Sequence, residues 1–141
     1  MTYIIEKDLC YDITGVCFKT HKALGRFCRE KQYCDDFEKR IIELLWEYDR
    51  EYEIKNLNPD SPKGNRVDFL IKKRVPVDFK AKNFITKEDY YQMLRYLLAS
   101  KLEVGLIINF RDAHLKPKRV LNNELYSGHS DANSDNSGRN I

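Results

Sequence analysis

The sequence predicts a mixed α/β domain in which an antiparallel hairpin is joined by a helix to a buried strand. Two period-two segments flank a short turn in the middle of the chain, and a continuous apolar run follows at 104–110. Apolar residues at helical spacing occur before the hairpin and again between it and the apolar run. The order helix, helix, three strands, helix, strand favours a central mixed sheet of about four strands flanked by helices.

Two helices are expected before the first strand. The first carries an apolar stripe at helical spacing and ends at Gly25, a typical C-terminal stop; its members are Ile13, Val16, Cys17, Thr20 and Leu24. The stripe of the second helix consists of Tyr33, Phe37, Ile41, Leu44, Leu45 and Tyr48. The period then changes to two over 51–57, which predicts a first strand, and the Pro, Gly, Asn and Asp residues of 58–65 indicate a turn.

The hairpin strands are predicted at 66–71 and 75–80, with 72–74 as the turn. Thr86 has the form of a helix N-cap with Asp89 at the third helical position. The helix that it opens carries the stripe Tyr90, Met93, Leu94, Leu97 and Leu98. The run 104–110 has the pattern of a strand buried on both faces, and a short strand or extended arm is expected over 116–120.

Composition fits one folded domain with a polar tail. The chain has 141 residues, 42% of them hydrophobic, and we assign 1–124 to the domain and 125–141 to a disordered tail rich in Ser, Asn, Asp and Gly. The net charge of +3 neither establishes nor opposes a nucleic-acid partner. We expect a cytoplasmic protein, since no signal peptide or membrane span is recognisable.

Four cysteines lie in the first quarter of the chain: Cys10, Cys17, Cys28 and Cys34. They lack the C-x-x-C spacing of zinc sites, and three of them fall on apolar helical positions. Reduced core thiols are therefore the better interpretation, which also suits a cytoplasmic protein.

The most informative feature of the sequence is an acid opposite an acid in the hairpin. If 72–74 is the turn, directly opposed residues have numbers that sum to 146, so Asp68 faces Asp78. Lys80 shares the face of Asp78, because side chains alternate along a strand. Opposed like charges destabilise a hairpin, whereas a divalent cation between them reverses the sign of that interaction. The pattern therefore favours a metal-dependent site, with a solvated polar face on an edge hairpin as the alternative.

The other face of the hairpin supports this register. It is wholly apolar, and a slip of one residue would bury the charges instead; its residues are Val67, Phe69, Ile71, Val75, Val77 and Phe79. Pro76 lacks an amide hydrogen, so the strand is expected to be locally unpaired or bulged there.

Further polar residues could belong to the same site. Glu30 lies in the first turn of the second helix, where helix-start chemistry alone also explains an acid. Gln92 and Tyr96 lie four apart on one face of the third helix, where ordinary exposed polar residues are the alternative. Two basic groups could meet phosphates or serve solubility: Lys72, Lys73 and Arg74 in the turn, and Lys116, Lys118 and Arg119 after the last strand.

Asp68 followed by Asp78-Phe79-Lys80 resembles the D…(D/E)-x-K core of the PD-(D/E)XK nuclease superfamily, whose element order also matches. More specifically, the chain resembles the GxxExxY proteins of that superfamily. The resembling stretches, in the family's order from about residue 10 to residue 120, are 21–25, 30–33, 68–71, 78–81, 92–97 and 104–110. The chain differs at Phe27, where the family usually has the naming glycine, at Asp78, where Glu is commoner, and at Pro76.

The resemblance implies a restriction-endonuclease-like core with Asp68 and Asp78 as metal ligands and Lys80 as the catalytic lysine. It implies that Glu30 completes or supports the metal site, and that Gln92 and Tyr96 help to position the site or the nucleic acid. The expected cofactor is Mg²⁺, with Mn²⁺ as an alternative. Many small nucleases of the superfamily are dimers, so a homodimer is an expectation as well, although the sequence identifies no interface.

The function expected is hydrolysis of phosphodiester bonds in nucleic acid, with DNA as the expected polymer. The alternative is a non-catalytic module that keeps the nuclease fold and binds nucleic acid or a protein. A third interpretation is a structural or regulatory α/β domain with solvated acids. Neither the substrate's structure nor the mode of cleavage follows from these residues.

Overall fold

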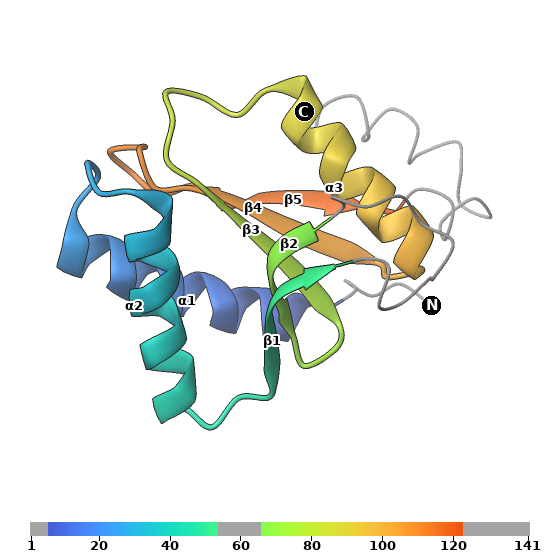
Figure 1. Cartoon of the computed structure of the whole chain (residues 1–141), viewed down its shortest axis with the longest axis horizontal. Coiled ribbons are helices and arrows are strands. Elements are labelled where there is room, and N and C mark those ends of the chain that lie inside the picture. The colour runs from blue at the N-terminus through green and yellow to red at the C-terminus, as the bar shows by residue number, and fades with distance from the viewer. Residues whose placement is uncertain (1–5, 54–65, 123–141) are drawn as a thin grey trace.

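The computed structural model describes residues 6–53 and 66–122. Its elements are α1 (Lys7–Leu24), α2 (Glu30–Glu43), β1 (Tyr48–Glu53), β2 (Arg66–Ile71), β3 (Val75–Lys80), α3 (Lys87–Ser100), β4 (Val104–Asn109) and β5 (Lys118–Leu121). Figure 1 shows the strands side by side between the helices. The predicted turn at 58–65, the end of the predicted first strand and the predicted tail lie outside the described residues.

The strands form one mixed sheet in the order β1-β2-β3-β4-β5. β3 and β4 are parallel and α3 connects them, as expected for a helical crossover, while the other neighbouring strands are antiparallel. The described sheet has five strands rather than about four, because 118–121 pairs with β4 as a true strand. The α/β class predicted from the sequence is confirmed.

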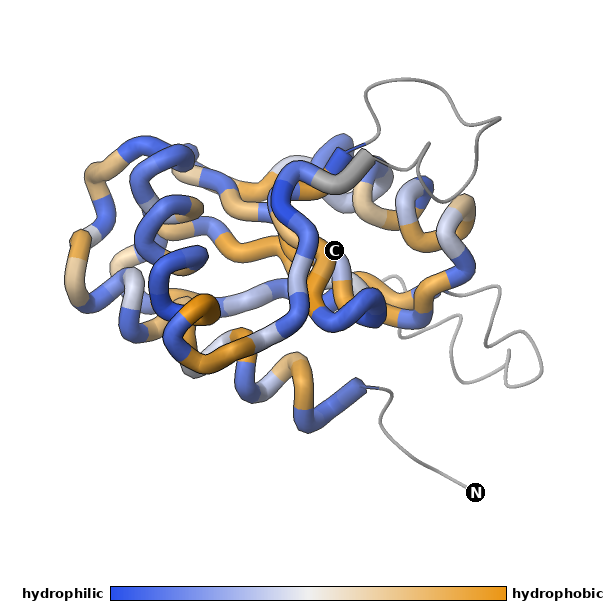
Figure 2. The backbone as a smooth tube through the Cα atoms, turned by 60° about the horizontal axis from the view of Figure 1, so that its bottom comes forward, coloured by the Kyte–Doolittle hydropathy of each residue, from blue (hydrophilic) through white to orange (hydrophobic). Residues whose placement is uncertain are grey.

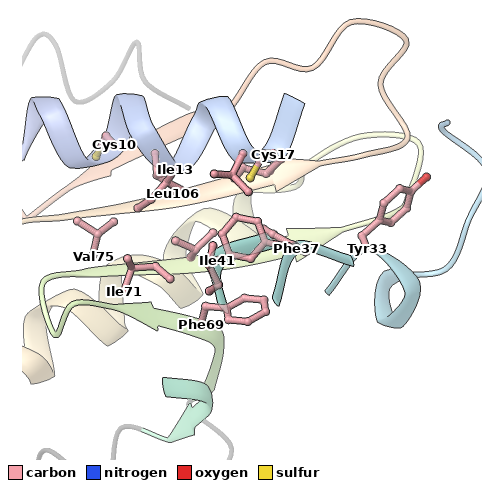
Figure 3. Close-up of a cluster of buried hydrophobic side chains, with 14 of the residues drawn as sticks. Cys10, Ile13, Cys17, Tyr33, Phe37, Ile41, Phe69, Ile71, Val75 and Leu106 are labelled. Atoms are coloured by element: carbon pink, nitrogen blue, oxygen red, sulfur yellow. The ribbon is translucent and has the colours of Figure 1, made fainter. Parts of the chain in front are cut away.

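The helices cover both faces of the sheet. α1 and α2 pack on one face over Phe69, Val77 and Leu106, and α3 packs on the other face over Ile107 and Val120. Figure 3 shows side chains of α1 and α2 converging with those of β2, β3 and β4. In Figure 2 the strands in the middle of the molecule are largely hydrophobic, as a sheet buried on both faces requires.

Several predicted boundaries are confirmed. α1 ends at Gly25, whose φ of 79° is easily reached only without a Cβ. α3 begins at Thr86, whose hydroxyl accepts the Asp89 amide while the Asp89 carboxylate accepts the Thr86 amide. All six residues of β4 are buried. Cys10, Cys17 and Cys34 are buried, Cys28 is half-buried, and all four thiols are free.

The predicted extent of α2 is wrong at its C-terminal end. The helix stops at Glu43, Leu44 and Leu45 are exposed, and Tyr48 begins β1 three residues before the predicted strand start. Leu45 takes a left-handed φ of 61°, while the Trp46 amide bonds Ile41 O and the Leu45 amide bonds Ile42 O. This is a Schellman stop without the usual glycine, so the sequence carried no signal for it. In Figure 2 this connection is a hydrophobic segment on the outside of the molecule.

Leu98 was predicted to face the core and is 37% exposed, so the apolar stripe of α3 is narrower than expected. No described helix is long and apolar enough to cross a membrane.

Candidate active site

The hairpin has the register that the sequence predicts. Phe69 pairs with Val77, Leu70 with Pro76 and Ile71 with Val75, and each pair sums to 146. Pro76 lies before the ladder to β4, whose pairs begin at Val77, so the missing amide hydrogen coincides with a locally unpaired edge. Five of the six residues predicted on the apolar hairpin face are buried in the core beneath α1 and α2: Phe69, Ile71, Val75, Val77 and Phe79. The prediction is wrong for Val67, which is buried in the core beneath α3, so the alternation of β2 breaks between Val67 and Phe69. The register therefore brings the two acids together.

Asp68 and Asp78 lie where the pairing of β2 with β3 ends. The ladder stops at Phe69 and Val77, so the aspartates do not form the next backbone pair that a regular hairpin would give. Their carboxylates bond the opposite strand instead. The Asp68 amide donates to Asp78 Oδ1 at 3.3 Å, and the Phe79 amide donates to Asp68 Oδ2 at 2.7 Å. The two acids therefore occupy the gap between the parting strands.

The environment of Asp68 disfavours its negative charge. Burial, followed by the charge of Asp78, raises the pKa of Asp68 to about 7, although the hydrogen bond from the Phe79 amide opposes that change. A weaker contribution comes from the charge of Glu30. Near neutral pH, a metal cation can therefore take the place of the proton on the Asp68 carboxyl group.

Lys80 lies beside Asp78, two residues further along β3 and on the same face of that strand. Its Nζ is 3.0 Å from Asp78 Oδ2, and the side chains of Lys80 and Asp78 are 17% and 15% exposed. Burial acts to lower the pKa of Lys80, but the nearby carboxylates of Asp78, Asp89 and Glu30 outweigh it and raise the pKa. Lys80 is therefore a cation held in place beside the acid pair.

Asp89, which the sequence indicates only as part of a helix cap, is also a site residue. Its carboxylate lies 3.7 Å from Lys80 Nζ and also contacts Lys82 Nζ. Burial favours its neutral form, but hydrogen bonds from Lys82 and Thr86 and the charge of Lys80 lower its pKa overall. An Asp at the third position of a capping box, preceded by Lys80 and Lys82 at the end of a strand, is the signal that could have revealed it.

Asn109 is a second residue that sequence reasoning missed. It lies at the end of β4 opposite Lys80 and is 2% exposed. Its side chain accepts the amides of Lys82 and Arg111 and donates to Lys82 O. A polar residue ending an otherwise apolar strand was the available signal. Asn109 therefore holds the backbone of Lys82 in place, two residues after Lys80 at the end of β3.

Glu30 is the first residue of α2 and is exposed. Its charge affects the pKa of Asp68, Lys80 and Cys34, which places it within electrostatic reach of the acid pair. Cys34, one helical turn further, is buried beside the site. Burial, followed by the charge of Asp68, raises the pKa of its thiol.

Gln92 and Tyr96 do not share one environment. Gln92 is half-buried, whereas Tyr96 is 1% exposed and belongs to the core beneath α3 with Met93 and Leu97. The alternative that both are exposed polar residues is wrong, because the face of α3 that carries Tyr96 packs on the sheet. Their functional role stays a prediction.

The basic turn lies at the far end of the hairpin from the acids, about 13 Å along β3 from Asp78. Its three side chains contact other parts of the chain. Lys72 Nζ lies 5.3 Å from the centre of the Trp46 ring, Lys73 is 3.6 Å from Asp49, and Arg74 is 3.4 Å from Glu6.

The second basic group is divided between the two faces of the sheet. Ile107 pairs with Asp78 on one side and with Lys118 on the other, so Lys118 shares the face of Asp78. Arg119 pairs with Leu106 and lies toward α1, where its charge affects the pKa of Cys10. Lys116 is exposed before β5.

A sheet with helices on both faces, carrying two acids and a lysine where two strands part, defines a restriction-endonuclease-like core. A profile of the PD-(D/E)XK nuclease superfamily matches residues 7–120. The chain therefore belongs to the PD-(D/E)XK nuclease superfamily. Searches of curated proteins and of solved structures gave no match. Membership of the GxxExxY group within the superfamily stays a prediction.

Proposed function

We propose that this protein is a Mg²⁺-dependent nuclease, with Mn²⁺ as an alternative ion, that hydrolyses phosphodiester bonds in nucleic acid. The observation that carries the proposal is the pair Asp68 and Asp78, crowded together with Lys80 beside them. Membership of a nuclease superfamily supports it. The sheet itself does not need these charges, because mutual repulsion of the acids opposes folding.

The residues present fit a hard divalent cation. Within 6–53 and 66–122, no group of three or more His, Cys, Asp or Glu side chains converges as a complete metal cage. Mg²⁺ does not require one, because one or two carboxylates with water and a substrate phosphate suffice. Asp68 and Asp78 would hold the ion, and Glu30 would support it with its charge. A bound Mg²⁺ supplies a water of lowered pKa and neutralises charge on the phosphate.

The chain's own groups would do the remaining work. Lys80 would donate hydrogen bonds to phosphate oxygens as negative charge builds on them, and it could orient the attacking water. Asp89 would hold the Lys80 ammonium in place without touching the substrate. Because both lysine and acid are largely buried, they need little rearrangement when the substrate binds.

Nucleic acid is the expected partner, and DNA the expected polymer. Lys118 lies in register with Asp78 across β4, so it would add a positive charge near a phosphate bound at Asp78. The turn residues Lys72, Lys73 and Arg74 would meet only a polymer long enough to extend along the hairpin. We include a homodimer and a cytoplasmic location in the proposal.

The test is cleavage of a panel of single- and double-stranded DNA and RNA with Mg²⁺, with Mn²⁺ and with EDTA. We expect metal-dependent cleavage by the wild type and a loss of roughly 100-fold or more in Lys80→Ala and Asp78→Ala. Lys19→Ala, an exposed lysine on α1, is the charge-matched control and should retain full activity. Circular dichroism would verify that each variant folds.

Two results would contradict the proposal. Cleavage that persists unchanged in both site variants would show that the acids and Lys80 do not act. Binding of nucleic acid by the wild type without cleavage under any metal condition would favour the non-catalytic module instead.

A further inference from the structure

Three connections gather at the end of the sheet where the acid pair lies. They are the α1–α2 connection, the β3–α3 connection and the β4–β5 connection, which Figure 1 shows together at one side of the molecule. The first carries Phe27, which is 75% exposed, and the second carries Phe84, which is 70% exposed. Large aromatic side chains this exposed contribute little to folding. Both rings lie on connections at the same end of the sheet as the acid pair, and the contacts of Phe27 single it out.

Phe27 is accompanied by two guanidinium groups. The Cζ atoms of Arg26 and Arg111 lie 4.8 and 5.6 Å from the centre of its ring. Arg26 Nε donates to Arg111 O at 2.8 Å, and Arg111 Nε donates to Arg26 O at 2.9 Å. These reciprocal hydrogen bonds join two segments that are far apart in the sequence. They also hold two cations over an exposed ring.

The connection that carries Phe27 is anchored rather than loose. The Tyr33 hydroxyl donates to Gly25 O at 2.5 Å and accepts the Cys28 amide at 3.1 Å, so it secures both sides of Phe27. The Tyr33 ring stacks on Phe110 with centroids 4.3 Å apart. Figure 3 shows the Tyr33 hydroxyl pointing away from the apolar cluster. The exposed ring therefore projects from a fixed backbone.

The same cluster is tied to the catalytic candidate through main-chain contacts. The Phe110 amide donates to Lys80 O at 2.9 Å, and Asn109 bonds both Lys82 and the Arg111 amide. Glu30, the first residue of α2, follows Phe27 by three residues. A polymer bound across Lys80 would therefore pass close to the Arg26–Phe27–Arg111 cluster.

We infer that the Arg26–Phe27–Arg111 cluster is a stacking platform for an unpaired base of the substrate. An aromatic ring offers a face to any base, and the guanidinium groups attract the adjoining phosphates. Bases inside an intact duplex already stack on each other, so the platform selects single strands or unpaired ends. The inference rests on the proposed function, because it assumes that the neighbouring site acts on nucleic acid.

The test uses a labelled single-stranded oligothymidylate and an abasic oligonucleotide of the same length, bound in EDTA and followed by fluorescence anisotropy. Loss of one base–aromatic stack predicts roughly 5- to 150-fold weaker binding of oligothymidylate by Phe27→Ala. Binding of the abasic strand should not change, because the phosphates and both arginines remain. Phe27→Trp should restore binding to the base-containing strand. Tyr11→Ala, an exposed aromatic on the outer face of α1, is the matched control.

Two results would overturn the inference: unchanged oligothymidylate binding by Phe27→Ala, or an equal loss on both strands. Failure of the wild type to bind any single strand would also overturn it. In that case, metal-dependent cleavage of a blunt duplex that Lys80→Ala abolishes would leave the proposed nuclease function intact. If the wild type neither binds nor cleaves any nucleic acid, the proposed function fails as well.

Discussion

At the scale of single residues, the site combines precise hydrogen bonding with unfavourable charge. Asp68 is fixed by the Phe79 amide, while Asp78 accepts the Asp68 amide and contacts Lys80. The hydrogen bonds settle where the carboxylates lie, but they do not remove the repulsion that raises the pKa of Asp68. A bound cation would remove this repulsion between the carboxylates. The metal-free protein is therefore less stable at this site, and cation binding would restore the lost stability.

The raised pKa predicts that Asp68→Asn stabilises the metal-free protein above neutral pH. Because the pKa of Asp68 is about 7 in the folded state and about 4 in the unfolded state, its neutral form favours folding. This contribution is complete below about pH 4 and is lost as the pH rises through 7. We expect the variant to be roughly 2–4 kcal/mol more stable than wild type at pH 8.

Urea unfolding of both proteins in EDTA between pH 4 and pH 8 would measure this difference. The gap should shrink toward zero as the pH falls, since wild-type Asp68 then carries its own proton. A variant that is less stable than wild type at pH 8 would contradict the assignment of the charge as unfavourable.

Asp89 is expected to position Lys80, and Thr86 offers a matched control. Asp89→Asn can still accept the Thr86 amide but loses its charge beside the Lys80 ammonium. We expect kcat/KM to fall roughly tenfold. We also expect the alkaline limb of the pH–rate profile to move to lower pH, because the pKa of Lys80 falls when the neighbouring charge is removed. Thr86→Ala should cost about 1 kcal/mol of stability through the lost cap and leave the profile in place. Profiles that move equally in both variants would indicate a purely structural role.

The sequence predicted which site residues are neighbours wherever strand register and alternation alone determine the contacts. Register was enough to bring Asp68 beside Asp78, and alternation along β3 was enough to put Lys80 beside Asp78. Asp89 and Asn109 were not predicted as site residues, because their contacts depend on the conformation of the connections after β3 and β4. Tyr96 is buried although its spacing fits an exposed polar face, because residue spacing does not show how much of the surface of α3 the sheet covers.

At the scale of elements, the end of α2 shows why periodicity alone did not predict where that helix stops and β1 begins. The apolar stripe continues past Glu43 into Leu44 and Leu45, yet the backbone leaves the helix at Leu45 in a left-handed conformation. Trp46 then packs against the core and β1 begins. Tertiary packing of Trp46 therefore overrides a periodic pattern that is locally indistinguishable from helix.

The Schellman stop predicts opposite effects for two neighbouring substitutions. Leu45→Gly relieves the left-handed strain of a side chain that is 89% exposed, and should raise stability by about 0.5–1 kcal/mol. Leu44→Gly, at a right-handed position with φ of −82°, should lower stability by about 0.5–1 kcal/mol. Thermal unfolding of both variants would test the pair. Two effects of the same sign would show that backbone conformation does not decide the outcome.

At the scale of the whole molecule, the site lies between the two cores that the sheet separates. Phe69 and Phe79, beside the acids, pack under α2, while α3 covers the face that carries Asp78 and Lys80. The sequence predicted a mixed sheet flanked by helices and a helical crossover from the hairpin to β4. It could not predict the contact of Arg26 with Arg111, because 85 residues separate them and only the closed fold brings them together.

This placement predicts that a divalent cation stabilises the whole domain against unfolding. A ligand that binds only the folded state contributes RT ln(1 + [L]/Kd), or about 1.4 kcal/mol at tenfold excess over Kd. For a domain of this size, the midpoint of thermal unfolding should rise by roughly 3–6 °C with Mg²⁺ or Mn²⁺ relative to EDTA. Asp78→Asn should abolish the increase, whereas Asp8→Asn, with the same change of charge on α1, should retain it. A wild-type midpoint that is the same with metal and with EDTA would contradict a metal site at the acid pair, whatever the protein's affinity for nucleic acid.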